Sequence, residues 1–261
     1  MMNTNESLFY QQERHFWSAI CLDTVHIDSH TVAYFSELPL PIFNFIYLHQ
    51  GASITSFEKA ERLFKQQAKP YVLVIHEQTL HQFESEITQR GLIVDGESTA
   101  MVLPQKVLSQ YSTAPQLETN YQIKLCNEQL SDWAQPLVTA FPVDAEGEED
   151  DSTVIDEYIR FHQRALDKQT CMMHFVLYAE QQPVSTLTLT LDNKTARLDD
   201  IGTDIQFQGK GFATQLIKHA LSICNQHGVE QCVLEASSDG LSIYQKLGFE
   251  AIFNYHSFIA E

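Results

Sequence analysis

The stretch QGKGFA, residues 208–213, decides the fold. It follows a strand pattern that ends near Thr203 and precedes a helix pattern, in which apolar residues recur every three or four positions until Gly228. Two glycines let the backbone approach a ligand closely, and the first turn of the helix offers unpaired N–H groups to an anion such as pyrophosphate. Thr214 stands where the dinucleotide-binding fingerprint has its third glycine. The turn therefore predicts a phosphate site of another kind.

Helix and strand patterns alternate on both sides of this turn. Before it we expect two helices, a strand hairpin and a third strand; after the helix that it starts, we expect a strand, a short helix and a last strand. The ranges are about 132–141 and 153–166 for the two helices, 174–179, 184–191 and 197–203 for the strands, and 232–236, 241–247 and 249–259 for the last three elements. In the hairpin, Thr186, Thr188 and Thr190 alternate with leucines, which predicts one buried face.

The first half of the chain is less regular. It has helix candidates at 56–66 and 80–89 and strand candidates at 70–75 and 99–103. Residues 105–120 are polar, include Pro115 and have no sustained period, which is typical of a linker. We therefore expect a smaller α/β domain over residues 1–115 and a second domain over residues 120–261, with an α+β fold built on a mixed sheet.

The charge of the chain limits its partners. The 261 residues include 34 acidic and 16 basic side chains, a net charge of -18. Nucleic acids and anionic membranes are bound through clusters of Lys and Arg, so we expect neither as a partner. The longest apolar runs are far shorter than the roughly 20 residues that span a bilayer, and the N-terminus lacks a signal-peptide pattern. We expect a cytoplasmic protein, with a homodimer as one option for its oligomeric state.

The cysteines and histidines give no sign of a metal site. The 5 cysteines are widely spaced without a Cys-x-x-Cys pair, and the 11 histidines lack the spacing of metal ligands. We expect free thiols, no disulfide framework and no structural metal.

A second motif makes the interpretation of the glycine turn more specific. About thirty residues after it stands IYQKLGF, residues 243–249. The Gln-x-x-Gly-x-Ala at Gln208, Gly211 and Ala213 resembles the acyl-CoA pyrophosphate signature of the GCN5-related N-acetyltransferase (GNAT) superfamily, and residues 243–249 resemble its late Leu-Tyr-x-x-Leu-Gly-Phe motif. The resemblance covers about residues 121–261 and implies the GNAT fold there.

The first half resembles, faintly, the degenerate N-terminal half of two-part members of this superfamily. The similarity lies in Asn44-Phe45, the strand at 70–75, Gly91-Leu92 and Met101. Because this half has neither a Gly-x-Gly turn nor a tyrosine motif, the resemblance implies a pseudo-repeat that shapes the acceptor cleft or an interface and holds no catalytic residue.

The resemblance also implies acetyl-CoA as the cofactor and a set of residues that bind it. They are Ile201, Gly202 and Thr203 on the strand, Gln208, Gly209, Lys210, Gly211, Phe212, Ala213 and Thr214 at the turn, and Ser237 further on. Tyr244 aligns with the tyrosine that commonly protonates the departing CoA thiolate, and a phenol can give that proton near neutral pH without being ionised. Two candidates remain for the base that deprotonates the amine. Glu235 resembles the glutamate that some members use. Asp199 shares one face of its strand with Ile201 and Thr203, and members with a base on that strand use this face.

The acceptor is indicated only by charge. Six carboxylates lie in the run 144–151, in the connection that borders the acceptor site in this superfamily. They would attract a cationic amine, or else they form a solvated loop. We therefore expect an acetyl-CoA-dependent N-acetyltransferase that transfers an acyl group to a primary, cationic amine by direct attack in a ternary complex. The alternative is a non-catalytic acyl-CoA-binding sensor or assembly module. The sequence names neither the amine nor the acyl chain length.

Overall fold

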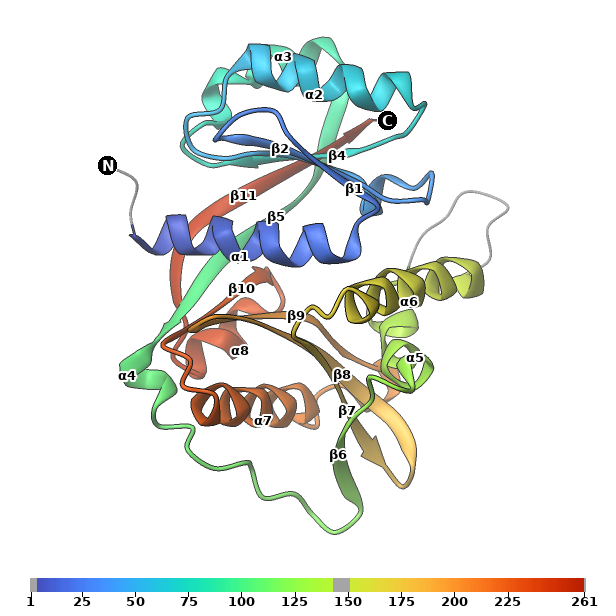
Figure 1. Ribbon diagram of the computed structural model, residues 1–261, viewed down its shortest axis with the longest axis vertical. Coiled ribbons are helices and arrows are strands. Elements are labelled where there is room, and N and C mark those ends of the chain that lie inside the picture. Colours follow the sequence, from blue (N-terminus) through green and yellow to red (C-terminus); the bar gives the residue numbers. More distant parts are fainter. Residues whose placement is uncertain (1–3, 143–150, 261) are drawn as a thin grey trace.

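One mixed sheet runs through both halves of the chain (Figure 1). The computed structural model describes residues 4–142 and 151–260, without the side chains of 151–153. The strands are β1 (Asp23–His26), β2 (Thr31–Phe35), β3 (Phe45–Leu48), β4 (Val72–His76), β5 (Leu92–Pro104), β6 (Tyr121–Leu125), β7 (Met172–Ala179), β8 (Gln182–Asp192), β9 (Thr195–Thr203), β10 (Gln231–Ser237) and β11 (Glu250–Ala260). Their order across the sheet is β1-β2-β3-β4-β11-β5-β10-β9-β8-β7-β6. The expected mixed α/β fold is confirmed.

The helices and strands follow one another in the same order in the two halves. The helices are α1 (Thr4–Ile20), α2 (Ile54–Gln66), α3 (Glu84–Gln89), α4 (Gln105–Leu108), α5 (Leu130–Ala140), α6 (Asp151–Asp167), α7 (Phe212–Gln226) and α8 (Leu241–Lys246), with short 3-10 turns η1 (Pro41–Phe43), η2 (Leu80–Gln82) and η3 (Ile205–Phe207). Apart from α4, β6, α5 and the 3-10 turns, α1-β1-β2-β3-α2-β4-α3-β5 parallels α6-β7-β8-β9-α7-β10-α8-β11. The parallel strand pairs β3/β4 and β9/β10 occupy corresponding places. The first half is thus a pseudo-repeat of the second in the order of its elements.

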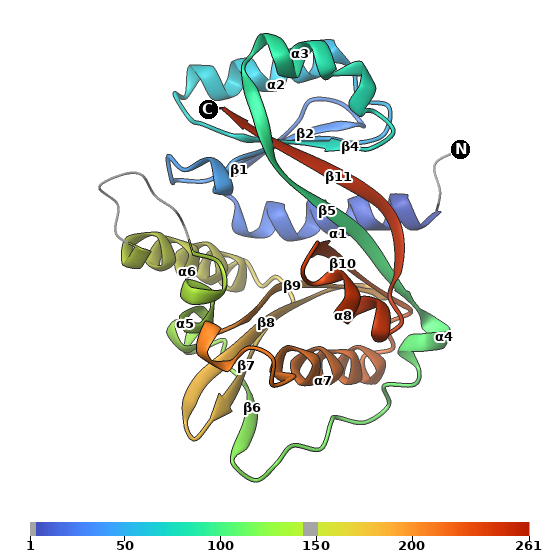
Figure 2. The ribbon, with the colours of Figure 1, turned by 180° about the vertical axis from the view of Figure 1, so that it is seen from behind.

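The two halves exchange their last strands. β5 leaves the first half and pairs with β10 of the second, while β11 returns from the second half and pairs with β4 of the first. β5 and β11 also pair with each other in antiparallel fashion, and Figure 2 shows them side by side along the middle of the molecule. The proposed division into domains 1–115 and 120–261 stays a prediction. In the described residues, the strands of both halves belong to one sheet.

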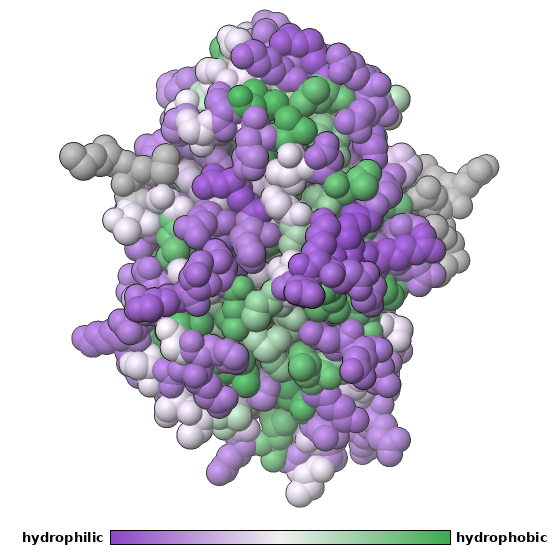
Figure 3. Space-filling model, viewed as in Figure 1, coloured by the Kyte–Doolittle hydropathy of each residue, from purple (hydrophilic) through white to green (hydrophobic). Residues whose placement is uncertain are grey.

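Helices cover both faces of this sheet. On one face, α1 packs through Phe9 and Phe16 onto β2, β5 and β10, and α5 and α6 continue that layer. On the other face, α7 covers the second half and α2 covers the first. Figure 1 shows the result, with α1 in the centre, α2 and α3 at the top and α7 below. The helices turn polar residues outward, so α2 and α3 look mostly hydrophilic in Figure 3.

This double cover corrects the prediction for the hairpin of β7 and β8. The hairpin exists, but Thr186, Thr188 and Thr190 are as fully buried as the leucines between them. The leucines face α7, and the threonines lie under the second layer, where α5 contacts β8. Threonine suits a strand on either face because it is β-branched, so its polarity alone did not indicate solvent.

No helix in the described part of the chain combines the length and the apolar character needed to cross a membrane.

Candidate active site

The parallel strands β9 and β10 separate halfway along their length. They pair from Thr195 and Gln231 as far as Leu198 and Leu234. Beyond that point β9 stays paired with β8, and β10 stays paired with β5. The gap between the diverging ends opens into a cavity of about 650 Å³. The register of the sheet therefore creates the cleft.

The cleft brings together nearly all of the residues that the sequence singled out. The lining includes Asp199, Ile201, Gly202, Thr203, Gln208, Gly209, Gly211, Phe212, Ala213, Thr214, Glu235, Ser237 and Tyr244. Lys210 does not line it; its side chain is exposed and the ammonium lies 4.6 Å from the ring centroid of Phe207. The residues thus lie together as the resemblance requires, and their roles stay predictions.

The glycine turn at the start of α7 has the geometry of an anion site. Gly209 and Gly211 have φ angles of +75° and +80°, in the left-handed region that favours glycine. Gly211 is the N-cap of α7, and the first N–H groups of a helix have no partner within it. A Cβ atom added to either glycine would meet no protein atom within 4 Å. The turn therefore borders open space, which fits the close approach of a pyrophosphate.

Tyr244 faces the cleft from α8, and a glycine makes room for its ring. The side chain is 9% exposed. A Cβ atom on Gly240 would lie 2.8 Å from Cε2 of Tyr244, so the ring packs directly against the glycine backbone. Burial, and then the negative charge of Asp199, raise the pKa of Tyr244 to about 12. The phenol therefore stays protonated at neutral pH and can donate a proton.

Both candidate bases contact one buried arginine that the sequence analysis missed. Arg197 on β9 is 2% exposed and lies under the rings of α1, with Cζ 5.2 Å from the centroid of Phe9. Its Nε donates to Oδ1 and Oδ2 of Asp199 at 2.8 and 3.1 Å, and Nη2 lies 3.7 Å from Oε2 of Glu235. Ser98, on the exchanged strand β5, donates to Oε1 of Glu235 at 2.6 Å. The Arg-x-Asp spacing on one strand face was the available signal, whereas nothing in the sequence indicated Ser98.

The two carboxylates differ in how freely they can take a proton. Burial raises the pKa of Asp199 to about 7, although Arg197 opposes the shift. Burial also raises the pKa of Glu235, against the effects of Arg197 and Ser98. The Asp199 side chain is 11% exposed and both of its oxygens accept from Arg197, while Glu235 is 19% exposed and its Oε2 has only the 3.7 Å contact. Glu235 is therefore the less tightly bound of the two carboxylates, and its role as the base stays a prediction.

A β-bulge bends β9 beside these groups. Thr186 of β8 pairs with Gly202 and Thr188 pairs with Asp199, so one residue of β8 faces two of β9. Asp200 and Ile201 lie between the two paired positions of β9, and the φ angle of Asp200 is +53°. Bulges of this kind turn side chains away from the regular alternation and are frequent next to active sites. No sequence pattern predicted the bulge.

Asp200 begins a buried chain of polar groups. Its Oδ1 accepts from the hydroxyl of Tyr158 at 2.5 Å, and its Oδ2 lies 3.6 Å from Nε2 of His162. His162 and His174 share a hydrogen bond of 2.8 Å, and Nδ1 of His174 lies 3.0 Å from Oδ1 of Asn127. Burial raises the pKa of Asp200 to about 6 and lowers that of His162 to about 3. This row of buried polar side chains therefore places the Asp200 carboxylate, at the bulge, next to neutral imidazoles.

The acidic run 144–151 falls almost wholly outside the described residues, which resume with the backbone of α6 at Asp151. Its expected part in attracting a cationic amine stays a prediction.

Comparisons with known proteins agree on one family. Residues 143–257 match the family model described as the acetyltransferase (GNAT) domain. The uncharacterized N-acetyltransferase CgeE of Bacillus subtilis is 35% identical over 83 residues, which cover 30% of this chain and 32% of that protein. The chain thus matches about a third of the length of that curated relative.

Two of the similar solved structures resemble the chain over most or all of its length. A GCN5-related N-acetyltransferase from Kribbella flavida aligns over 100% of this chain and 96% of its own, with a TM-score of 0.68 and 12% identity. A tandem GNAT protein from the clavulanic acid biosynthesis pathway aligns over 89% of this chain and 79% of its own, with a TM-score of 0.60 and 13% identity. At these identities the likeness is one of fold, and it includes the first half.

Proposed function

Because residues 143–257 match the family model of the acetyltransferase (GNAT) domain, we propose that this protein transfers an acetyl group from acetyl-CoA to a primary amine. The observation that carries the proposal is the cleft between β9 and β10. One cavity contains a glycine turn at a helix N-terminus, a protonated tyrosine and two carboxylates of raised pKa. Carboxylates and phenols whose pKa values are shifted by burial are typical of acid–base sites.

The proposed binding mode assigns the cofactor to the open end of the cleft. The amides of Gly209, Gly211 and the first turn of α7 would hold the pyrophosphate, and the unpaired edge of β9 near Thr203 would pair with the pantetheine arm. Acetyl-CoA would supply the acyl group as a thioester. The net charge of -18 opposes a polyanion at long range, so binding relies on these local donors.

The proposed chemistry needs one base and one acid. Glu235 removes a proton from the ammonium, which frees the nitrogen lone pair for attack. The N–C bond of the amide forms and the C–S bond of the thioester breaks. Tyr244 then gives its proton to the sulfur, so CoA leaves as the thiol. Arg197 holds Asp199 and Glu235 in place and is a positioning residue in this scheme.

Binding can be tested at the turn with a matched control. Gly211→Val would force a side chain into the open space where the pyrophosphate is expected, so we expect acetyl-CoA affinity in calorimetry to fall at least tenfold. Gly228, at the other end of α7, also has a positive φ, +70°, and open space around it. Gly228→Val carries the same backbone strain and should leave the affinity unchanged. Absence of acetyl-CoA binding by the unaltered protein would refute the proposal.

Transfer is tested separately by thiol release across a panel of primary amines. Release of CoA that depends on a particular amine supports the enzyme. Tyr244→Phe should lower turnover and leave the affinity for acetyl-CoA nearly intact, because it removes only the proton donor. Tight binding without release across the panel would favour the acyl-CoA-binding module instead.

A further inference from the structure

A second cavity of about 250 Å³ adjoins the cofactor cleft. The two cavities share Phe141 and Asp200 in their linings. Apart from Asp200, the lining residues of the second cavity are apolar or aromatic, and they come from α5 with Phe141 directly after it, from α6 and from η1. We call it the apolar pocket. Ile42 and Phe43 of η1 belong to the first half of the chain, so both halves build this pocket.

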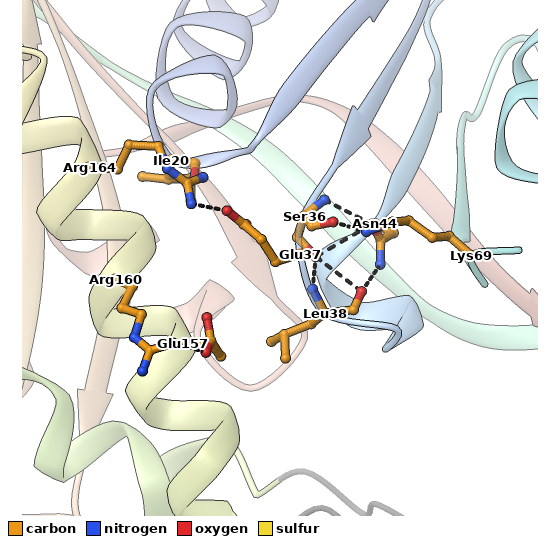
Figure 4. A network of polar contacts seen from close by, with 9 residues as sticks. All are labelled: Ile20, Ser36, Glu37, Leu38, Asn44, Lys69, Glu157, Arg160 and Arg164. Carbon is orange, nitrogen blue, oxygen red and sulfur yellow. Dashed lines mark hydrogen bonds and ion pairs between the residues drawn. The ribbon is translucent and has the colours of Figure 1, made fainter. Parts of the chain in front are cut away.

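The wall contributed by the first half is fixed by buried polar contacts (Figure 4). Asn44, which follows η1, donates to the carbonyl oxygens of Leu38 and Leu40, both at 2.8 Å, and accepts from the amide of Ser36 at 2.9 Å. Asn44 is fully buried. The segment that carries Ile42 and Phe43 is therefore held in a closed loop, and the pocket is largely formed before a ligand enters.

The same segment is tied to the opposite wall. Arg164 of α6 forms an ion pair with Glu37 and donates to the carbonyl oxygen of Ile20 at 3.2 Å (Figure 4). The Phe43 ring lies 5.4 Å from the ring of Tyr158, also on α6. These contacts fix the width of the pocket between η1 and α6.

The size and lining of the pocket select an apolar group. A cavity of about 150 Å³ can hold benzene, so 250 Å³ accommodates a ring with a short alkyl arm. A polycation would have to give up much of its hydration there for a single carboxylate. The pocket therefore does not fit a polyamine.

Two features favour the acceptor over the acyl chain as the occupant. Ile42 and Phe141, which line the pocket, are 38% and 55% exposed, so the described part of its lining can be reached from solvent. An acceptor arrives in that way, whereas an acyl chain arrives attached to CoA. In addition, Asp200 lines both cavities at their junction; its side chain is about nine-tenths buried, with Oδ1 accepting from Tyr158 and Oδ2 3.6 Å from Nε2 of His162. A carboxylate complements an ammonium group and has nothing to bind in an alkyl chain.

We propose that the acceptor is a primary amine with an aromatic or branched aliphatic group, which occupies the apolar pocket while the amino group lies near Asp200 at the junction with the cleft. This inference rests on the proposed acetyltransferase function. It assigns the first half of the chain a part in choosing the substrate, through Ile42 and Phe43.

The test compares amines with acetyl-CoA held constant. We expect kcat/KM for 2-phenylethylamine to exceed that for ethylamine and for spermidine at least tenfold, since the phenyl ring would be removed from water in the apolar pocket. Ile42→Trp should narrow the pocket and reduce the preference for 2-phenylethylamine over ethylamine at least fivefold. Ile54, on α2, is 39% exposed and lies away from the pocket, so Ile54→Trp is the matched control and should leave the preference unchanged.

Three outcomes would overturn the inference while leaving the proposed function intact. Equal use of ethylamine and 2-phenylethylamine is one, and a preference for spermidine is another. The third is a preference for hexanoyl-CoA over acetyl-CoA, with ethylamine as acceptor, that Ile42→Trp abolishes; it would assign the pocket to the acyl chain. Failure of the proposed function itself would appear differently, as an absence of acetyl-CoA binding in calorimetry.

Discussion

At the scale of single residues, one arginine contacts both carboxylates of the candidate site, but unequally. Arg197 is bonded to Asp199 through Nε and approaches Glu235 only to 3.7 Å. Burial keeps the pKa of both carboxylates above the usual range, although the positive charge of Arg197 opposes the shift. Oε2 of Glu235 has only the 3.7 Å contact with Arg197. The difference between the two candidate bases therefore comes from their contacts with Arg197 as well as from their own side-chain chemistry.

This arrangement predicts different pH profiles for two variants. A base acts only when deprotonated, so kcat/KM should rise with pH through the pKa of the base. Glu235→Gln should lower kcat/KM by about 100-fold or more and abolish that rise. Asp199→Asn removes a neighbouring negative charge, so it should lower the pKa of Glu235, shift the rise to lower pH and keep most of the activity.

The opposite result would reverse the assignment. The pKa of Asp199 is about 7, so an enzyme that used Asp199 as its base would show a rise near pH 7 that disappears in Asp199→Asn. Calorimetric titration with acetyl-CoA serves as the control, because both variants should still bind the cofactor.

At the scale of elements, the exchanged strand β11 buries groups that the first half alone would leave more open. His76 ends β4 and pairs with Tyr255 of β11 in the sheet. Its ring lies 4.4 Å from the ring of Phe253, and the residue is 0% exposed. Burial, and then the nearby His49, lower the pKa of His76 to about 4. The strand exchange therefore holds a neutral histidine inside the molecule.

The stability of the protein should respond to pH through this residue. An unfolded histidine has a pKa near 6.5, so acidification protonates His76 in the unfolded state first and favours unfolding. The contribution of His76 is fully present above about pH 6.5 and is lost as the pH falls toward 4. Between pH 7.5 and 5, His76→Gln should gain about 2 kcal/mol of stability relative to the unaltered protein.

Urea unfolding at the two pH values measures this difference. His81 is exposed on η2, so His81→Gln provides the control and should show no such gain. An equal response of the two variants would mean that burial by β11 does not shift the titration of His76.

At the scale of the whole molecule, the exchange of β5 and β11 makes the halves depend on each other. β10 has β5 as its neighbour on one side, and β11 lies between β4 and β5. Residues 120–261 alone would lose both neighbours of β11 and leave long strand edges unpaired, which promotes association and misfolding. The active-site half thus relies on a strand that the first half contributes.

We therefore expect the intact chain to unfold in one cooperative transition, measured by calorimetry. Residues 120–261 expressed alone should fail to show that transition, and co-expression with residues 1–115 should restore it, because β5 is then supplied by a second polypeptide. Two separate transitions in the intact chain, or a stable fragment 120–261 that binds acetyl-CoA, would contradict the dependence.

The sequence predicted the second half well because its signals are local. Helix α7 has regular apolar spacing between two glycine boundaries, and the strands β7 to β9 are marked by β-branched and leucine residues. In the first half, the sequence analysis did not identify α1 or the strands β1 to β3. Their residues include buried polar groups such as Gln12 and Glu13, which disrupt the apolar period of α1 although both lie in the core. Tertiary partners, such as His49 and Tyr255 for Glu13, make that burial possible.

The sequence by itself indicated the glycine turn, because turn conformation depends on residue type and short spacing, and its resemblance to the GNAT motifs singled out Tyr244 and Glu235, with Asp199 as a second candidate base. Only the tertiary structure decided how they meet. The divergence of β9 from β10 opens the cleft, Arg197 and Ser98 set the environment of the carboxylates, and Ile42 and Phe43 reach the apolar pocket from the other half. These contacts join residues far apart in the chain, and a single sequence has no local pattern that specifies which distant strands will be neighbours.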